Sequence, residues 1–287
     1  MTAAAPLRVH APVRTATPRR YVLCRPDHFE VTYAINPWMD PAEPVDRARA
    51  VAQWDILRAT LEAHGHTVDT VPGEPGLPDM VFAANSGIVI GGLAMSARFH
   101  HPERSAEGPH FHRWFAGRDL RELRGAAEIN EGEGDFAYAG ERILGGVGFR
   151  CSLSAHDEVA RYFDLPVVSL ELIDPRFYHL DTALMVLDAT TVAYYPAAFS
   201  PAARAVLAEL YPDAILADEA DAVSFGLNGL SDGRHVFVDP GATGLIAQLR
   251  ERGFEPVPVD VSELRKGGGG VKCCVLEQHT RRDTTAG

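Results

Sequence analysis

The chain has 287 residues, of which 46% are hydrophobic and 23% are charged, as is typical of a globular protein with a sizeable core. Its formal net charge of −12 argues against nucleic acid or an anionic membrane as the main partner, because both attract basic surfaces. No apolar run approaches the length of about 18 residues that a membrane-spanning helix needs. Four scattered cysteines without a C-x-x-C pair exclude a disulfide framework and indicate free thiols in a reducing cytoplasm.

The composition divides the chain into one domain and two tails. Residues 1–20 are rich in Ala, Pro, Thr and Arg, contain no acidic residue and lack the apolar core of a secretory signal. We expect them, and residues 277–287, to be disordered. No shift in composition divides residues 21–276, so we predict that they form a single domain.

Within this domain, short strands alternate with helices. The predicted strands are 21–24, 66–71, 80–83, 88–90, 94–98, 136–138, 142–147, 166–170, 182–187, 191–195, 214–216, 221–227, 234–238 and 255–259. The predicted helices are 45–64, 102–115 (interrupted by Pro109), 154–163, 201–210 and 243–253. A strand–strand–helix–strand unit thus recurs about five times, with a period of roughly 45–55 residues that is typical of propeller-like arrays. The alternative is an α+β domain in which such units recur by chance.

Four consecutive glycines, residues 267–270, precede Cys273. Glycine adopts positive φ freely but at an entropic cost, so such a run is expected where the backbone bends sharply or approaches another group closely. The run could present the Cys273 thiol, a natural nucleophile, at the mouth of a pocket. The alternative is a flexible loop followed by two buried cysteines that act as small hydrophobic residues.

Two further segments carry titratable side chains. Glu131, Glu133 and Asp135 are separated by glycines and form either a solvated acidic loop or a negative socket for a guanidinium or ammonium group. His179 and Asp181 would share one face of an extended chain and suit general acid–base catalysis. A histidine that is hydrogen-bonded in the core is the alternative.

Asp79 and Asn85 bracket the apolar run 80–83. Each also fits a turn, since Asp79 follows Pro78 and Asn85 precedes Ser86-Gly87. The sequence alone does not separate a turn residue from a substrate ligand at either position.

Taken in order, these segments resemble the pentein superfamily of guanidine-modifying enzymes, over residues 21–276. The matching motifs are Phe82-x-x-Asn85, Glu103-Arg104, Glu131-Gly132-x-Gly134-Asp135, Gly148-Phe149-Arg150, His179-Leu180-Asp181-Thr182 and the glycine run before Cys273. The chain is most similar to dimethylarginine dimethylaminohydrolases, arginine deiminases and arginine dihydrolases. The resemblance implies a five-bladed α/β propeller that acts on a small cationic guanidino substrate without a metal or cofactor.

The resemblance also implies a role for each matching residue. Cys273 would attack the guanidinium carbon, His179 would protonate the departing amine and later activate water, and Glu131 would orient His179 and hold the guanidinium. The implied substrate ligands are Asp135 and Asp181 for the guanidinium, Arg104 and Arg150 for the α-carboxylate, and Asn36, Asp79 and Asn85 as further contacts.

Asn85 departs from the usual pattern, because arginine deiminases and dimethylargininases typically carry an acidic residue there. Asn85, Asn36 and the Glu-Gly-x-Gly-Asp spacing resemble the arginine dihydrolase branch, which converts arginine to ornithine, ammonia and CO2, although bacterial dimethylargininases share the pattern. We therefore predict a hydrolase of the guanidinium C–N bond of arginine or Nω-methylated arginine, acting through a covalent thiouronium intermediate. An arginine dihydrolase, an amidinotransferase and a catalytically silent arginine-binding protein are the alternatives, and a homo-oligomer is left open.

Overall fold

The strands follow one repeating pattern. In the computed structural model, which describes residues 13–281, a first strand pairs antiparallel with a second, and the second pairs parallel with a third. Within these residues the pattern occupies three three-stranded sheets and occurs twice in one six-stranded sheet, which makes five units in a mixed α/β fold. The repeat agrees with the one predicted from the sequence.

The first unit takes its strands from both ends of the chain. The units are β15–β1–β2 (Leu276–His279, Arg20–Cys24, Thr67–Val71), β3–β4–β5 (Gly87–Ile90, Leu93–Ser96, Glu122–Gly125), β6–β7–β8 (Phe136–Tyr138, Ile143–Val147, Val167–Glu171), β9–β10–β11 (Leu184–Val186, Val192–Tyr194, Ile215–Leu216) and β12–β13–β14 (Leu230–Ser231, His235–Val238, Glu255–Pro258). The parallel pairing of β15 with β3 joins the first two units into the six-stranded sheet.

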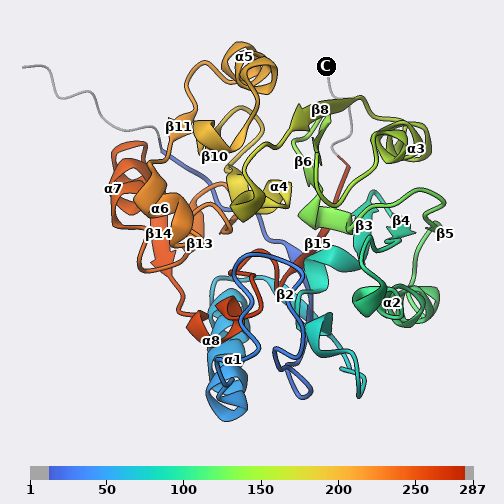
Figure 1. Ribbon diagram of the computed structural model, residues 1–287. Coiled ribbons are helices and arrows are strands. Elements are labelled where there is room, and N and C mark those ends of the chain that lie inside the picture. Colours follow the sequence, from blue (N-terminus) through green and yellow to red (C-terminus); the bar gives the residue numbers. More distant parts are fainter. Residues whose placement is uncertain (1–12, 282–287) are drawn as a thin grey trace, which may run out of the picture.

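A helix connects the second strand of each unit to the third, because parallel strands need a crossover connection. These helices are α1 (Arg47–Ala63), α2 (Glu107–Ala116), α3 (Leu153–Phe163), α5 (Pro201–Leu210) and α7 (Thr243–Glu251). They lie on the outside, around the strands (Figure 1). In α1, the side chains of Ala50, Trp54, Leu57 and Leu61 recur every three or four residues and are almost fully buried, so one face of the helix packs on the core.

Both tails predicted from the sequence include residues that are ordered in the structure. Arg20 begins β1, and the Thr17 amide donates to the Asp232 carbonyl over 2.9 Å, so the segment before β1 is packed against the fifth unit. At the other end, Glu277 lies in β15, which pairs with both β1 and β3. The short C-terminal segment that contains Glu277 forms a strand inside the sheet, because it pairs on one side with β1 and on the other with β3. Residues 1–12 and 282–287 lie outside the described residues.

Two predicted strands are wrong. The run 80–83 lies in two 3-10 turns, Pro78–Val81 and Ala83–Ser86, and the run 221–227 begins in the short helix α6 (Glu219–Val223). Both runs are largely buried, and a short apolar run has the same composition whether its backbone is extended or coiled. The helix α2 is not interrupted by Pro109, because that residue lies in the first turn, where its missing N–H is not needed.

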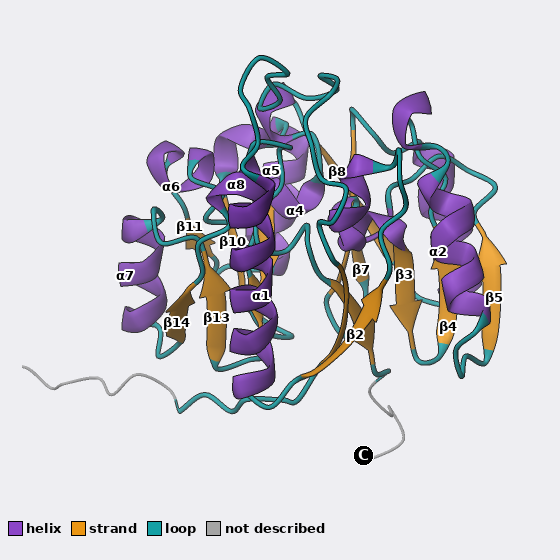
Figure 2. Cartoon of the chain, turned by 90° about the horizontal axis from the view of Figure 1, so that it is seen from below, coloured by secondary structure: helices purple, strands orange, loops and turns teal. Residues whose placement is uncertain are grey.

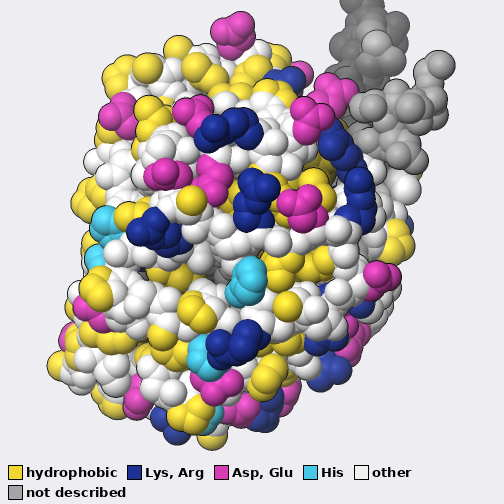
Figure 3. Space-filling model, turned by 90° about the vertical axis from the view of Figure 1, so that its right-hand side faces the viewer, with side chains coloured by type: hydrophobic (Ala, Val, Ile, Leu, Met, Phe, Trp, Pro, Cys, Tyr) yellow, Lys and Arg dark blue, Asp and Glu magenta, His cyan; other side chains and the backbone are white. Residues whose placement is uncertain are grey.

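Charges of both signs are interspersed on the face shown in Figure 3, and neither sign forms a large continuous patch there. None of the helices within residues 13–281 combines the length and apolar character required to cross a membrane.

Candidate active site

The glycine run 267–270 is held against other groups along its whole length. An added Cβ would lie 2.8 Å from the Phe82 ring at Gly267, 2.5 Å from the Asn36 amide at Gly268, 2.5 Å from the Phe82 ring at Gly269 and 2.8 Å from Asn228 Oδ1 at Gly270. Gly268 also has a φ of +88°. Each distance is shorter than a Cβ tolerates, so the expectation of a close backbone approach is confirmed and the flexible-loop alternative is wrong.

This run places Cys273 in a buried polar environment. The residue is 2% exposed, and its Sγ lies 3.3 Å from Asp181 Oδ2 and 3.2 Å from Asn228 Nδ2. Burial raises the pKa of the thiol well above its ordinary value, and the Asp181 carboxylate raises it further. Burial and Asp181 thus both favour the protonated thiol, and a nearby positive charge would favour the thiolate.

Cys274, which is fully buried, packs in the same hydrophobic cluster as Trp54 and Phe82. The backbone of residues 271–274 is a turn, and Cys274 packs into this cluster from that turn.

Glu131 is the first residue of the acidic loop and has no exposed surface. Its Oε2 accepts hydrogen bonds from His179 Nε2 at 2.7 Å and from Arg150 Nη1 at 2.9 Å, and its Oε1 accepts from the His100 amide at 3.2 Å. Burial by itself would raise the pKa of Glu131, but Arg150 and His179 outweigh it and hold that pKa far below its ordinary value. Glu131 is thus a carboxylate that fixes the orientation of the His179 ring, and the solvated-loop alternative is wrong.

Asp135 and Asp181 flank the same histidine. Asp135 Oδ2 accepts the Glu131 backbone amide at 2.6 Å, and burial raises the pKa of Asp135 to about 7, a rise to which Glu131 adds and which His179 opposes. Burial also raises the pKa of Asp181, while His179 and Lys272 oppose the rise. Asp181 lies in α4 (Leu180–Ala183), a four-residue helix that begins directly after His179, so the predicted extended chain is wrong. Figure 2 shows α4 above the strands.

Asn85 links this cluster to Arg104. The side-chain amide of Asn85 donates to the Glu131 carbonyl at 3.3 Å and accepts from Arg104 Nη1 at 2.8 Å. The Arg104 guanidinium also makes two bonds of 2.8 Å to the Glu107 carboxylate and one of 3.2 Å to the Asp79 carbonyl. In this structure Arg104 therefore supports Asn85 and Glu107 rather than facing an open space.

The remaining predicted residues border the cluster. Asp79 Oδ2 accepts from the Tyr33 hydroxyl at 2.9 Å, and burial raises the pKa of Asp79, although Arg104 opposes the rise. Arg150 donates from Nη2 to the Ile35 carbonyl at 2.8 Å. Asn36 Nδ2 donates to the Gly267 carbonyl at 3.2 Å, which ties the β1–α1 loop to the glycine run. The structure thus brings all ten predicted residues into one connected cluster.

Two residues of this cluster were not predicted from the sequence. Asn228 contacts Cys273, and Lys272 donates to Glu133 Oε2 at 2.7 Å, which joins the cysteine turn to the acidic loop. The repeat itself could have identified Asn228. The first strand of each unit is preceded, within three positions, by one cluster residue: Asn85, Asp135, Asp181, Asn228 and Cys273.

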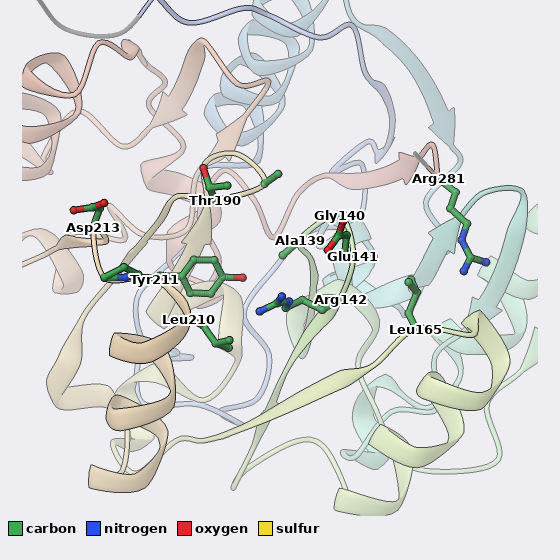
Figure 4. A pocket seen from close by; sticks show the side chains of 12 residues that line it. Ala139, Gly140, Glu141, Arg142, Leu165, Thr190, Leu210, Tyr211, Asp213 and Arg281 are labelled. Atoms are coloured by element: carbon green, nitrogen blue, oxygen red, sulfur yellow. The ribbon is translucent and has the colours of Figure 1, made fainter. Parts of the chain in front are cut away.

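A cavity of about 800 Å3 lies elsewhere, and none of the predicted residues lines it. It is formed by the β6–β7 turn, the β9–β10 turn and the end of α5, with Arg142 and Tyr211 pointing towards each other (Figure 4). Asp135 directly precedes β6 and the cavity residue Ala139 directly follows it, so the cavity and the cluster lie at opposite ends of the strand. The cavity is separate from the chemistry described above. Residues 13–281 contain no group of three or more His, Cys, Asp or Glu side chains placed to hold a metal ion.

No family model matches the chain. The N(G),N(G)-dimethylarginine dimethylaminohydrolase of Mycobacterium tuberculosis is 53% identical over 266 residues, which cover 93% of this chain and 88% of that protein. The bifunctional arginine dihydrolase/ornithine cyclodeaminase ArgZ of Synechocystis is 38% identical over 264 residues, 90% of this chain but 37% of the longer relative. The crystal structure of the ArgZ N-terminal domain, a mutant form bound to substrate, matches with a TM-score of 0.87 at 35% identity and covers 91% of this chain and 98% of that domain. The chain therefore belongs to the pentein superfamily, in the family of dimethylarginine dimethylaminohydrolases and arginine dihydrolases.

Proposed function

We propose that the protein hydrolyses the guanidinium C–N bond of Nω-methylated arginine and releases citrulline and an amine. One observation carries this proposal: Asp79 Oδ1 and Asp181 Oδ1 are buried and lack a hydrogen-bond partner within residues 13–281. Buried polar atoms are rarely left unpaired, and a planar cation with several N–H donors would satisfy such acceptors. The 53% identity to a dimethylarginine dimethylaminohydrolase supports the same substrate class.

The first half of the reaction needs an ionised Cys273. A bound guanidinium offsets the burial and the Asp181 charge that keep the pKa of the thiol high, so substrate binding favours the thiolate. Its sulfur attacks the guanidinium carbon, and a C–S bond forms. His179, oriented by Glu131, gives its proton to the departing amine as the C–N bond breaks, which leaves a thiouronium intermediate on Cys273.

The second half returns the enzyme to its starting state. His179, now neutral, accepts a proton from water as that water attacks the thiouronium carbon. The C–S bond breaks with its electron pair on sulfur, the hydroxyl proton of the intermediate passes to solvent, and citrulline leaves. The Cys273 thiolate then takes back the proton from Asp181 Oδ2. A substrate α-carboxylate would take the place of the Ile35 carbonyl at Arg150, with Arg104 holding the neighbouring Asn85 in place.

We also propose that the five units are the blades of a five-bladed propeller with the site at its axis. Three observations support this: the strand pattern repeats, β15 closes the first unit from the far end of the chain, and each unit supplies one cluster residue. The four cysteines, all unpaired, support a reducing compartment such as the cytoplasm.

Hydrolysis of unmodified arginine to ornithine is a second candidate. Asn85 favours it, since this residue is neutral and contacts both Glu131 and Arg104. The ArgZ domain, described as an arginine dihydrolase, also covers nearly the same length of chain.

Incubation of the purified protein with asymmetric dimethylarginine, monomethylarginine and arginine tests both candidates. Citrulline with dimethylamine or methylamine is the expected result, and the Cys273→Ser variant should form neither. Ornithine, ammonia and CO2 from arginine would favour the dihydrolase instead. Transfer of the amidino group to an added amine would indicate an amidinotransferase, and no reaction with any guanidino compound would refute the proposal.

A further inference from the structure

Asn228 occupies a constrained turn between α6 and β12, and its side chain is fully buried. Three residues earlier, Phe225 has a φ of +63°, a left-handed conformation that is uncommon for a bulky side chain. The Asn228 backbone amide donates to the Phe225 carbonyl at 3.0 Å, so the unusual backbone directly positions Asn228. Strain of this kind persists where surrounding packing enforces it, and it is concentrated at functional sites.

The Asn228 carboxamide uses its full hydrogen-bonding capacity on the cysteine turn and its surroundings. Oδ1 accepts the Gly270 and Cys273 backbone amides, both at 3.0 Å. Nδ2 donates to the Asp181 carbonyl at 3.0 Å and to Cys273 Sγ at 3.2 Å. A carboxamide has two acceptor and two donor positions, so all four are taken.

These four bonds determine which way the amide points. In the opposite orientation, the NH2 group would face two backbone N–H groups, and the carbonyl oxygen would face the Asp181 carbonyl and the sulfur. The donor therefore faces Sγ. Gly270 permits this arrangement, because a Cβ there would lie 2.8 Å from Asn228 Oδ1.

A fixed donor at the sulfur favours the thiolate over the thiol, because a hydrogen bond to the charged form stabilises it. Within the described residues, the other side-chain polar atom bonded to Sγ is Asp181 Oδ2, whose negative charge has the opposite effect. The Lys272 ammonium, from the adjacent residue, is bonded to Glu133 and the Val275 carbonyl instead.

We propose that Asn228 is a catalytic residue that stabilises the Cys273 thiolate, both when it forms before attack and when it leaves the thiouronium intermediate. This inference rests on the proposed function for the reaction in which the thiolate acts. When the thiolate forms, the S–H bond breaks, its electron pair stays on sulfur, and the proton passes to Asp181 Oδ2, which already accepts it in a hydrogen bond. The Nδ2–H bond to sulfur then strengthens.

Two variants of nearly unchanged shape test this role. Asn228→Asp keeps the acceptor for the Gly270 and Cys273 amides but removes the donor and adds a charge. Asn228→Leu removes both the donor and the acceptor without adding a charge. The measurement is the rate at which iodoacetamide alkylates Cys273 between pH 7 and 10, followed at that residue by mass spectrometry in the substrate-free full chain, with thermal unfolding recorded for each protein.

We expect both variants to react at least tenfold more slowly than the wild type at each pH, while they still unfold cooperatively. Slowing in Asn228→Asp alone would assign the effect to the added charge and overturn the proposal, as would rates within threefold of the wild type in both variants. Alkylation needs no turnover, so the result holds even if no guanidino substrate is hydrolysed. Where turnover is found, kcat should fall at least tenfold and KM should change less than threefold.

Discussion

His279 lies between two buried carboxylates and is the basis of our most quantitative prediction. Its Nε2 is 2.6 Å from Glu133 Oε1, and its Nδ1 is 3.1 Å from Glu277 Oε1. Burial alone would lower the pKa of His279, but Glu277 and Glu133 outweigh it and raise the pKa from 6.5 to about 9. Glu133 also accepts from Lys272, so this ion network extends to the turn that carries Cys273.

The raised pKa fixes the sign of the pH dependence. A rise from 6.5 to about 9 corresponds to about 3 kcal/mol of stability. The folded protein binds the proton more tightly than the unfolded chain, so this contribution is complete below pH 6.5. It declines as the pH rises towards 9 and is absent above it.

The variant His279→Gln isolates this contribution, because glutamine is neutral at every pH. We expect the variant to be less stable than the wild type by about 3 kcal/mol at pH 6 and by much less at pH 9.5, in urea denaturation followed at several pH values. His110→Gln is the matched control: His110 pairs with Glu74 at the surface, so the loss should stay below about 0.5 kcal/mol throughout. A gap between wild type and His279→Gln that does not change with pH would refute the reasoning.

Three further predictions concern the site. In the substrate assay, Cys273→Ser should abolish turnover and Cys274→Ser should keep most of it; the reverse pattern would show that Cys274 is the nucleophile. Gly268→Ala should lower the free energy of unfolding by about 1–3 kcal/mol and reduce activity more than tenfold, since the new Cβ meets Asn36 at a φ of +88°; wild-type stability would contradict this. Asn85→Asp should shift the products from arginine towards citrulline if the protein is a dihydrolase, and unchanged products in the same assay would count against that activity.

The local sequence was sufficient to predict features that depend only on residues close together in the chain. The period of the strand–helix units, the apolar faces of helices such as α1, and the glycine run before Cys273 all follow from residue types and their spacing. The motifs around Glu131, His179 and Cys273, taken together in their order, indicated a guanidine-modifying enzyme, although each motif is weak evidence alone. The relatives of the chain bear this out.

Only the tertiary structure decided which polar residues meet. Asn228 lies in a segment without a charged neighbour, and its contacts form when the turn after α6 packs against residues 270–273. Segment 277–279 was assigned to a tail because its polar residues have no local reason to form a strand; pairing with β1 and β3 provides that reason from across the chain. Backbone pairing between distant segments leaves little trace in local composition, whereas a nucleophile, its histidine and a close backbone turn each require particular side chains. The sequence therefore determined the chemistry, and long-range packing determined the strand order and the donor that faces the sulfur.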